Sequence, residues 1–320
     1  MPRPIKDSVI VITGASGGIG RATALELAKQ GATLLLAARR ENILQGLAQE
    51  CDRLGGQALA VPTDVTDEEA VKALARRAVE TFGRLDVWIN NAAVTLFARF
   101  EEAPAEVFRR VIETNVFGYV HGARAALPYF REQGSGTLIN VDSVVGAAPQ
   151  PYTSAYVMSK FAIRGLAGCL RMELNLDQAP NIHVCTVMPA TIDTPLFNHA
   201  ANYTGRQPKA MNPVYSAEHV AEAIAGLVER PQREIIVGQA GYLMVAQNSL
   251  APDLYERTMA QQVDSDHLKD QPAAATAGNL FEPAPDYPTV SGGWQHTGEP
   301  LEEVLRIAKR TAQGLGVPIY

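Results

Sequence analysis

A tyrosine and a lysine, Tyr156 and Lys160, lie one helical turn apart in a segment whose apolar spacing predicts a helix over residues 154–176. At this i, i+4 spacing the two side chains share one face of the helix. A free tyrosine has a pKa of about 10, and a nearby ammonium lowers it by favouring the phenolate. A tyrosine tuned in this way can exchange a proton with a substrate oxygen. Taken alone, the spacing is common by chance, and an ordinary surface pair also explains it.

Two polar residues upstream are candidate partners of this pair. Ser143 follows the strand predicted over residues 137–141, and ligands bind at the carboxyl ends of strands in parallel sheets. Its hydroxyl would hold a substrate oxygen, although a serine that merely ends a strand fits equally well. Asn115 falls inside the helix predicted over residues 105–130, where a polar amide is mildly unfavourable. It is either a hydrogen-bonded core amide or the anchor of a water beside the lysine.

A glycine-rich loop joins the first predicted strand to the first predicted helix. Its sequence is Thr13-Gly14-Ala15-Ser16-Gly17-Gly18-Ile19-Gly20. Glycines let the backbone approach a pyrophosphate closely, and the free N–H groups at the helix N-terminus attract the anion. The spacing is Gly-x-x-x-Gly-x-Gly, which differs from the common Gly-x-Gly-x-x-Gly fingerprint. Because a strand precedes the loop and a helix follows it, we favour dinucleotide binding over a purely structural turn.

Two adjacent arginines, Arg39 and Arg40, stand about twenty residues beyond the loop, where many NAD sites place an acid on the ribose 2′-hydroxyl. The first acid in this region is Glu41. A guanidinium fork suits a 2′-phosphate, which an acid would repel. The alternative is a pair of solvated arginines at the start of a helix. The sequence therefore predicts NADP(H) as the cofactor.

Short β-branched apolar runs alternate with longer amphipathic segments as far as residue 238. The runs predict strands over residues 9–13, 33–37, 58–61, 87–90, 137–141, 183–187 and 235–237. The amphipathic segments predict helices over residues 19–30, 41–54, 68–82, 105–130, 154–176 and 217–229. Such alternation indicates repeated βαβ units, and hence an α/β fold with a doubly wound parallel sheet of seven strands and helices on both faces.

The composition changes after about residue 240. Residues 241–262 have the character of one more helix, and residues 263–298 are rich in Pro, Gly, Ala and Asp without apolar periodicity. Residues 300–313 return to helical spacing. We therefore expect a cofactor-binding catalytic domain over residues 1–240 and a C-terminal extension over residues 241–320, which packs on the domain or mediates a contact.

The overall composition is ordinary for a globular protein. Of the 320 residues, 47% are hydrophobic, and the net charge of −6 gives no support to nucleic-acid or membrane binding, which need clustered positive charge. Cys51, Cys169 and Cys185 lie far apart in apolar patterns, which favours buried free thiols over disulfides or a zinc site. The six histidines are scattered, so no metal is expected. The apolar run near the N-terminus is too short for a signal peptide or membrane span, and we expect a reducing, cytoplasmic location.

Together these residues resemble the short-chain dehydrogenase/reductase family over roughly residues 7–240. The matched features are Thr13-Gly14-x-x-x-Gly18-Ile19-Gly20, Asp64-Val65, Asn90-Asn91-Ala92, Asn115, Ser143, Tyr156-x-x-x-Lys160, and Pro189 with Thr194. Found together and in this order, they are highly specific. The resemblance implies a Rossmann-like fold that binds NAD(P)(H) and an enzyme that interconverts carbonyls and alcohols.

The resemblance also implies a role for each matched residue. Tyr156 would donate or accept the proton, and Ser143 would orient the carbonyl oxygen. Lys160 would bind the nicotinamide ribose and lower the tyrosine pKa, while Asn115 would hold a proton-relay water. The cofactor would contact the glycine loop (Gly14, Ser16, Gly17, Gly18, Ile19 and Gly20), Asp64 and Val65 at the adenine, Asn91 and Ala92 along its path, and Pro189, Ile192 and Thr194 on the nicotinamide side.

Three positions depart from the family pattern. Ala93 and Ala190 stand where the family usually has glycine, and each added methyl would narrow the pocket near the nicotinamide or the substrate. Asp142, just before Ser143, stands where a small or hydroxylated residue is usual. We expect it to face away along the strand, since an inward carboxylate would disturb the local charge.

Three functions are therefore open. The first is NADP(H)-dependent reduction of a ketone or aldehyde, or the reverse oxidation, with Tyr156 as general acid/base. The second is a redox-sensing or scaffold protein that binds NADP(H) with little turnover, although such a protein has no need of the whole tetrad. The third and weakest is a racemase or epimerase, which would show no net cofactor consumption.

The substrate is expected to be a small carbonyl or alcohol. We expect residues 190–214 to form a lid over the site, and the aromatic residues Phe197 and Tyr203 within it favour a moderately hydrophobic substrate. The alternative is that this stretch is an ordinary surface segment. Trp294 and the extension would cover the site or lie at a subunit boundary. The family usually forms dimers or tetramers, which implies a homodimer or homotetramer.

Overall fold

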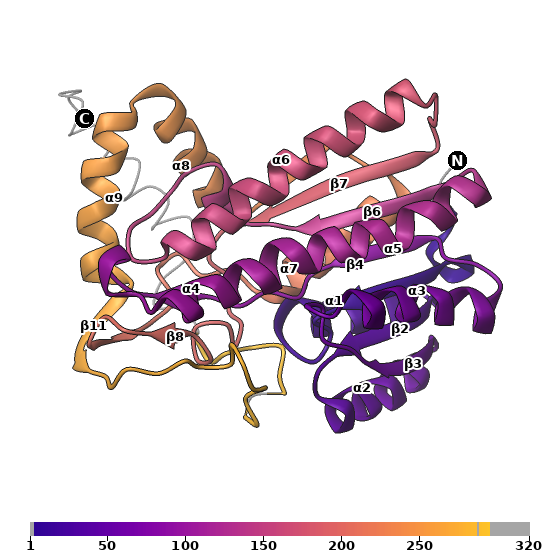
Figure 1. Ribbon diagram of the computed structural model, residues 1–320, viewed down its shortest axis with the longest axis horizontal. Coiled ribbons are helices and arrows are strands. Elements are labelled where there is room, and N and C mark those ends of the chain that lie inside the picture. The colour runs from indigo at the N-terminus through magenta and orange to yellow at the C-terminus, as the bar shows by residue number, and fades with distance from the viewer. Residues whose placement is uncertain (1–2, 287, 295–320) are drawn as a thin grey trace.

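Seven parallel strands form the central sheet (Figure 1). The structure is a computed structural model, and it describes residues 3–286 and 288–294 of the chain. The strands are β1 (Val9–Thr13), β2 (Thr33–Ala38), β3 (Gln57–Pro62), β4 (Val87–Asn90), β6 (Gly136–Val141), β7 (Ile182–Pro189) and β10 (Glu234–Val237). Their order is β10-β7-β6-β4-β1-β2-β3, which reverses between β1 and β4. The predicted doubly wound α/β sheet is confirmed. The reversal point opens a crevice at the carboxyl ends of the strands, where ligands bind in such sheets.

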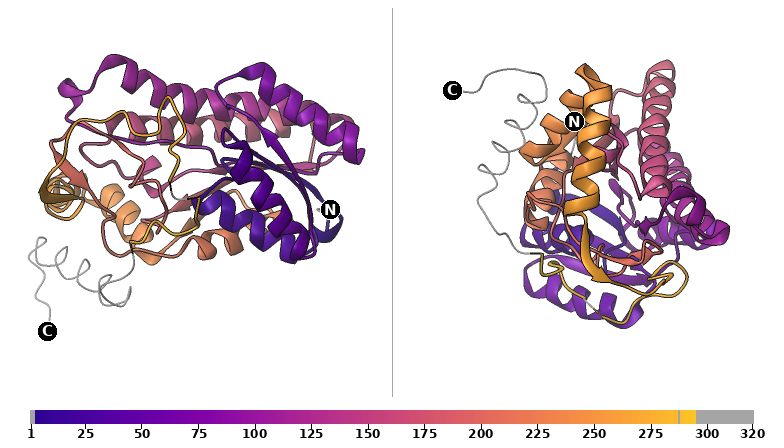
Figure 2. Two further views of the ribbon diagram at one scale, coloured as in Figure 1. Left: turned by 90° about the horizontal axis from the view of Figure 1, so that it is seen from below. Right: turned by 90° about the vertical axis from the view of Figure 1, so that its left-hand side faces the viewer.

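Helices cover both faces of the sheet (Figures 1 and 2). One face carries α1 (Gly18–Lys29), α2 (Glu41–Arg53) and α7 (Ala217–Glu229), and the other carries α3 (Glu68–Phe82), α5 (Gly118–Gln133) and α6 (Ser154–Leu176). Successive side chains of a strand point to opposite faces. Ile10 and Ile12 of β1 therefore enter the first core, whereas Val9 and Val11 enter the second. Burial on both faces explains why the strands are continuous apolar runs.

The long helix predicted over residues 105–130 is interrupted. α4 (Ala105–Ile112) continues through a π-helical turn, Glu113–Phe117, into α5. Asn115 lies in this turn and is fully buried. A π-bulge redirects side chains relative to a regular helix and is frequent at functional sites. Here it aims a polar side chain into the protein.

We call residues 239–286 and 288–294 the C-terminal arm. The arm folds back against the sheet domain. Residues 241–262 were predicted as one helix but form two, α8 (Gln239–Leu250) and α9 (Pro252–Asp266), since Pro252 has no N–H to continue α8. β11 (Leu268–Pro272) then pairs antiparallel with β9 (Arg206–Pro208), within the stretch that lacks apolar periodicity. The helix predicted over residues 300–313 lies outside the described residues, and the division at residue 240 stays a prediction.

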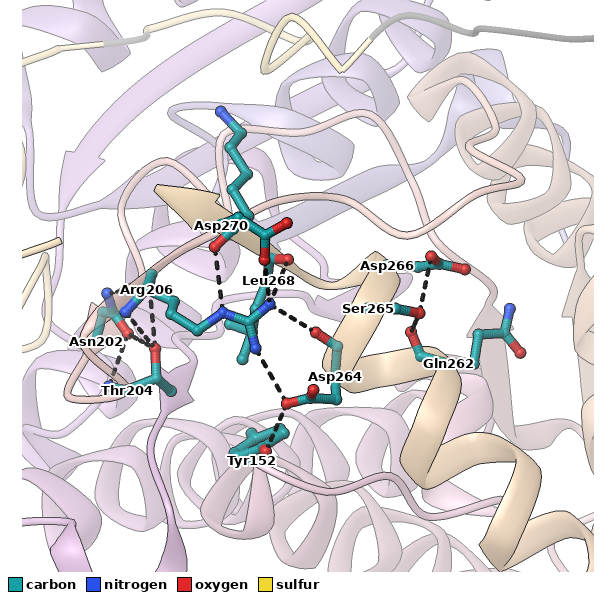
Figure 3. Close-up of polar contacts among 11 residues, drawn as sticks. Tyr152, Asn202, Thr204, Arg206, Gln262, Asp264, Ser265, Asp266, Leu268 and Asp270 are labelled. Atoms are coloured by element: carbon teal, nitrogen blue, oxygen red, sulfur yellow. Dashed lines mark hydrogen bonds and ion pairs between the residues drawn. The ribbon is translucent and has the colours of Figure 1, made fainter. Parts of the chain in front are cut away.

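Arg206 joins the base of the arm to the segment predicted as a lid (Figure 3). Its guanidinium donates to the carboxylates of Asp264 at 3.1 Å and Asp270 at 3.2 Å, and to the backbone carbonyls of Asp264 and Leu268. Asp264 also accepts a hydrogen bond of 2.8 Å from the hydroxyl of Tyr152. Within the lid segment, β8 (Ala201–Asn202) pairs with β5 (Leu96–Phe97). The lid is therefore tied both to the sheet domain and to the arm.

The cysteines only partly follow the prediction. Cys51 and Cys185 are buried, which raises the pKa of their thiols to about 12 and about 11, whereas Cys169 lies exposed on α6. All three are free. Among the described residues, no group of histidine, cysteine and acidic side chains could hold a metal ion. In the same part of the chain, no helix has the length and apolar character needed to span a membrane.

Candidate active site

A cleft of about 220 Å³ lies at the carboxyl ends of the strands. It extends from the side of β2, which carries the arginines, to the side of β6 and α6, which carries the tyrosine and lysine. The predicted residues that line it are Gly14, Ser16, Gly17, Gly18, Ile19, Arg39, Arg40, Asp64, Val65, Asn91, Ala92, Tyr156, Lys160 and Thr194. The predicted residues outside its lining are Gly20, Asn115, Ser143, Pro189 and Ile192.

The glycine loop forms a cradle that side chains would close. Gly14 and Gly18 have left-handed backbones, with φ of +67° and +55°. A Cβ on Gly14 would come within 2.7 Å of the Ala92 Cα, and one on Gly20 within 2.4 Å of the Gly14 carbonyl oxygen. The Asn91 amide donates to the carbonyls of Thr13 and Gly14 and so fixes the loop to the end of β4. The cradle fits the pyrophosphate of a dinucleotide, and Gly20 serves the packing of the helix on the loop.

Lys160 is buried at the far end of the cleft. Its ammonium donates to the Val141 carbonyl at 2.9 Å and lies 5.3 Å from the ring centroids of both Tyr119 and Tyr156. Burial lowers the pKa of Lys160 to about 8, and Asp142 acts in the opposite direction. The lysine thus points at the end of β6 as well as at the tyrosine.

Tyr156 stands one turn before Lys160 on α6, as predicted, but its electrostatics differ from the prediction. Burial raises the pKa of Tyr156 well above its ordinary range, Asp142 raises it further, and a hydrogen bond with Ser143 lowers it. The net pKa is therefore raised and not lowered, because the loss of solvation dominates. The influence of Lys160 on the phenolate stays a prediction. At neutral pH the phenol is protonated.

Ser143 and Asn115 lie behind the wall of the cleft. The Ser143 hydroxyl accepts from the Val145 N–H at 3.3 Å, beside its contact with Tyr156. The Asn115 amide accepts from the Val94 N–H at 2.9 Å and donates to the Val94 carbonyl at 2.9 Å and the Ser159 hydroxyl at 3.1 Å. Of the two interpretations of Asn115, these bonds favour the hydrogen-bonded core amide. It fixes Val94, which itself lines the cleft.

The sequence led us to expect that Asp142 faces away from the site, and this expectation is wrong. Asp142 is 3% exposed and lines the cleft, and its carboxylate oxygens have no hydrogen-bond partner among the described residues. Burial raises the pKa of Asp142 to about 7, against the opposing influence of Lys160 and Arg164. A Cβ on Gly146 would lie 2.6 Å from one of its oxygens, which shows that the turn after β6 folds over the carboxyl group. A titratable acid therefore sits between the strand end and the lysine.

The two arginines at the other end of the cleft are half-buried and hydrogen-bonded to other parts of the chain. The Arg40 guanidinium donates to the carbonyl and hydroxyl oxygens of Ser16 in the glycine loop. Both arginines also donate to backbone carbonyls of the C-terminal arm at 2.7 to 3.3 Å, those of Asn279, Leu280, Phe281, Ala284 and Asp286. Burial lowers the pKa of both guanidinium groups. The arm is therefore part of this end of the cleft.

Sequence reasoning missed several residues of the arginine end. Asn279, Pro283 and Ala284 line the cleft, and Arg110 pairs with Asp64 at 3.1 Å. Arg110 also donates to the Leu280 carbonyl at 3.1 Å. No local pattern marks the arm residues, because their contacts with Arg39 and Arg40 span some 240 positions and use main-chain carbonyls that every residue has.

Comparison with known proteins identifies the family of the chain. A family model described as short chain dehydrogenase matches residues 8–205. The uncharacterized oxidoreductase YxnA of Bacillus subtilis (strain 168) is 40% identical over 259 residues, which cover 80% of this chain and 72% of that protein. The probable oxidoreductase EphD of Mycobacterium tuberculosis is 39% identical over 189 residues, which cover 59% of this chain and 31% of that protein.

Two solved structures share the fold. A short-chain dehydrogenase/reductase from Burkholderia phymatum in complex with NAD has a TM-score of 0.71 at 26% identity, covering 79% of this chain and 97% of that one. An alcohol dehydrogenase from the archaeon Thermococcus sibiricus, complexed with 5-hydroxy-NADP, has a TM-score of 0.63 at 30% identity, covering 72% and 95%. The chain therefore belongs to the short-chain dehydrogenase/reductase family of oxidoreductases.

Proposed function

We propose that this chain is an NADP(H)-dependent oxidoreductase that interconverts a carbonyl and an alcohol, with Tyr156 as the general acid/base. The observation that carries the proposal is one continuous cleft lined by Tyr156 and Lys160, the glycine loop and an arginine pair. One structural neighbour holds an NADP analogue and another holds NAD, so the preference for the 2′-phosphate rests on Arg39 and Arg40.

The chain's own residues handle the proton. A bound nicotinamide dinucleotide supplies or accepts the hydride. Because burial keeps the pKa of Tyr156 high, its phenol carries a proton that it can donate to an oxygen on which negative charge develops. Ser143 stands outside the cleft lining, and its hydrogen bond with Tyr156 supports the proposal that it orients the same oxygen together with the tyrosine. The same phenol accepts the proton back when the alcohol is oxidised.

Lys160 supports the tyrosine once the proton has left. Its ammonium lies 5.3 Å from the Tyr156 ring, so it stabilises the phenolate that remains. The family places this lysine on the nicotinamide ribose, and the position of Lys160 in the cleft lining agrees with that role. Asn115 acts through Val94 rather than on the substrate, which makes it a positioning residue.

Three further features belong to the proposal. The substrate is a small carbonyl or alcohol, the location is the cytoplasm, and the assembly is a homodimer or homotetramer. The first and third follow from the family, and the second follows from the free, scattered cysteines. The lid aromatic Phe197 packs on His267 and Trp294, with ring centroids 5.4 and 6.0 Å away, so the arm holds part of the lid.

The direct test is the variant Tyr156→Phe. The matched control is Tyr242→Phe, because Tyr242 is an exposed tyrosine of α8 outside the cleft. We expect turnover of a ketone panel to fall by about 10²- to 10⁴-fold in Tyr156→Phe, because only the proton donor is lost. NADPH affinity, measured by calorimetry, should stay near that of the control. Retention of most of the activity would exclude the assigned role.

The cofactor assignment is tested separately, with wild-type protein. We expect kcat/KM with NADPH to exceed that with NADH, because the guanidinium groups favour a 2′-phosphate. A ratio below one would contradict this part of the proposal. NADPH binding without consumption across a broad carbonyl panel would instead favour the redox-sensing or scaffold alternative.

A further inference from the structure

The last described segment of the arm, residues 279–286 with 288–294, lies along the cofactor cleft, and we call it the strap. Its first half runs from β11 back toward the start of α2 (Figure 1). There its carbonyls accept hydrogen bonds from both terminal nitrogens of Arg39 and from one terminal nitrogen of Arg40, whose other terminal nitrogen donates to Ser16. A 2′-phosphate would need the same N–H groups, since a guanidinium binds phosphate through its fork of donors.

The second half of the strap meets the glycine loop. The Thr289 carbonyl accepts a hydrogen bond of 2.9 Å from the Gly18 N–H, at the first residue of α1. N–H groups at the start of a helix are the donors that bind phosphate in dinucleotide sites. The strap therefore meets phosphate donors at two separate places, the arginine pair and the loop.

Asp193 fixes the end of the strap. Its buried carboxylate accepts from the Ser291 hydroxyl and from the N–H groups of Gly292 at 3.0 Å and Trp294 at 2.9 Å. The Trp294 indole donates to the Thr194 carbonyl at 3.1 Å. Asp193 stands between Ile192 and Thr194. Its hydrogen bonds to the strap therefore lie on the loop that the family places at the nicotinamide.

Gly292 shows how closely the strap fits this loop. A Cβ at Gly292 would lie 2.2 Å from the Thr194 carbonyl oxygen, which is backbone and cannot easily yield. A side chain at this position would therefore push the strap off the loop. The contact also offers a way to loosen the strap without changing any residue in the cleft lining.

We propose that the strap competes with the phosphates of NADP(H) for their hydrogen-bond donors, with Asp193 as the residue that holds it in place. This inference rests on the proposed function. A phosphate forms stronger, charge-assisted bonds than a neutral carbonyl, so it displaces the strap. Its apparent affinity equals its intrinsic affinity multiplied by the fraction of molecules in which the strap is released.

The competition also bears on cofactor selectivity. A 2′-phosphate must displace the carbonyls of residues 279–286 from Arg39 and Arg40, whereas a 2′-hydroxyl has no need of those donors. The strap thus reduces the preference for NADP(H) that the two arginines would otherwise give. Residues 279–294 therefore determine specificity together with the arginine pair.

The experiment compares two probes that differ in the 2′-phosphate alone, adenosine 2′,5′-bisphosphate and adenosine 5′-monophosphate. Their affinities are measured by calorimetry on the full chain, without turnover. The variants are Gly292→Ala and Asp193→Asn, and the control is Gly46→Ala, whose methyl would enter open space on α2. We expect both strap variants to bind the bisphosphate about 5- to 10-fold more tightly, with a smaller gain for the monophosphate and none in the control.

A second measurement needs no variant. Hydrogen exchange at the amides of Gly292 and Trp294 in the wild-type chain should speed up when adenosine 2′,5′-bisphosphate binds, because their bonds to Asp193 break. Slower or unchanged exchange would overturn the inference. If the bisphosphate binds but neither variant binds it more tightly, the inference fails and the cofactor site stands. If neither nucleotide binds, both fail.

Discussion

The two ends of the cofactor cleft are built in different ways. The Tyr156 end uses side chains of the sheet domain, at α6 and the end of β6, within the part of the chain that the family model covers. The arginine end is completed by main-chain carbonyls of residues 279–286, beyond that part. The residues of the proposed chemistry thus lie within the family's own part of the chain, whereas the segment that we propose competes with the cofactor lies beyond it.

The attachments of the two ends differ as well. The sheet domain is held by apolar cores on both faces, and burial of this kind depends little on pH or salt. The arm also has an apolar contact with the sheet domain, where Tyr255, Met259 and Val263 cluster with residues of the turn after β6. Its base and its last described segment depend in addition on polar contacts, those of Arg206 (Figure 3), of Asp193 and of the arginine pair. Exposed charged contacts are screened by salt and change with protonation. These polar contacts should therefore respond to conditions that leave the apolar packing of both parts unchanged.

The largest effect is expected at the tyrosine end, from Lys160→Met. Removal of the ammonium leaves the phenolate of Tyr156 without a stabilising charge, and we expect kcat to fall by about 10²-fold or more. Stability should hold or rise, because a buried ammonium is costly to desolvate. Steady-state rates and thermal melting measure the two effects.

The control for this prediction is Lys72→Met, on α3, whose lysine is 46% exposed and pairs with Glu68 and Glu69. It should leave the rates unchanged. Equal rates in Lys160→Met and wild type would remove the lysine from the mechanism and, with it, the contrast between the two ends.

A smaller effect is expected from Asn115→Ala. The substitution leaves the N–H and carbonyl of Val94 without their partner in a buried place, where each unpaired group costs about 1–3 kcal/mol. We expect the free energy of unfolding in urea to fall by about 2 kcal/mol. Asn42→Ala, at an exposed position of α2, is the control. A loss within the error of the control would show that Val94 does not depend on this side chain.

The two ends of the cleft also differ in how much of their structure could be predicted from the sequence. The strands, the glycine loop and the Tyr156–Lys160 pair were predictable because periodicity and spacing encode them directly. The direction of the Tyr156 pKa was not, because it depends on how far the packed structure removes the phenol from water. The inward position of Asp142 was missed for a related reason, since the turn after β6 folds over its carboxyl group. The strap was invisible because main-chain carbonyls carry no residue signature.

The smallest effect concerns the base of the arm and its dependence on pH. His267 is buried against the rings of Phe97 and Phe197, and a ring nitrogen contacts the Lys209 carbonyl. Burial lowers the pKa of His267 to about 4, against about 6.5 in an unfolded chain. Between these values the unfolded chain binds more protons, so stability falls as the pH falls through this window. From pH 7 to pH 5.5 the loss is about 1 kcal/mol.

Asp142 opposes this change, so the two groups have to be separated. Its pKa is raised to about 7, so the folded protein binds the additional proton and stability rises as the pH falls toward 5.5. The change in stability between the two pH values should therefore be compared in wild type, His267→Phe and the exposed control His219→Gln. We expect His267→Phe alone to lack the loss of about 1 kcal/mol. If all three proteins changed alike, His267 would not be the pH-sensitive contact of the arm.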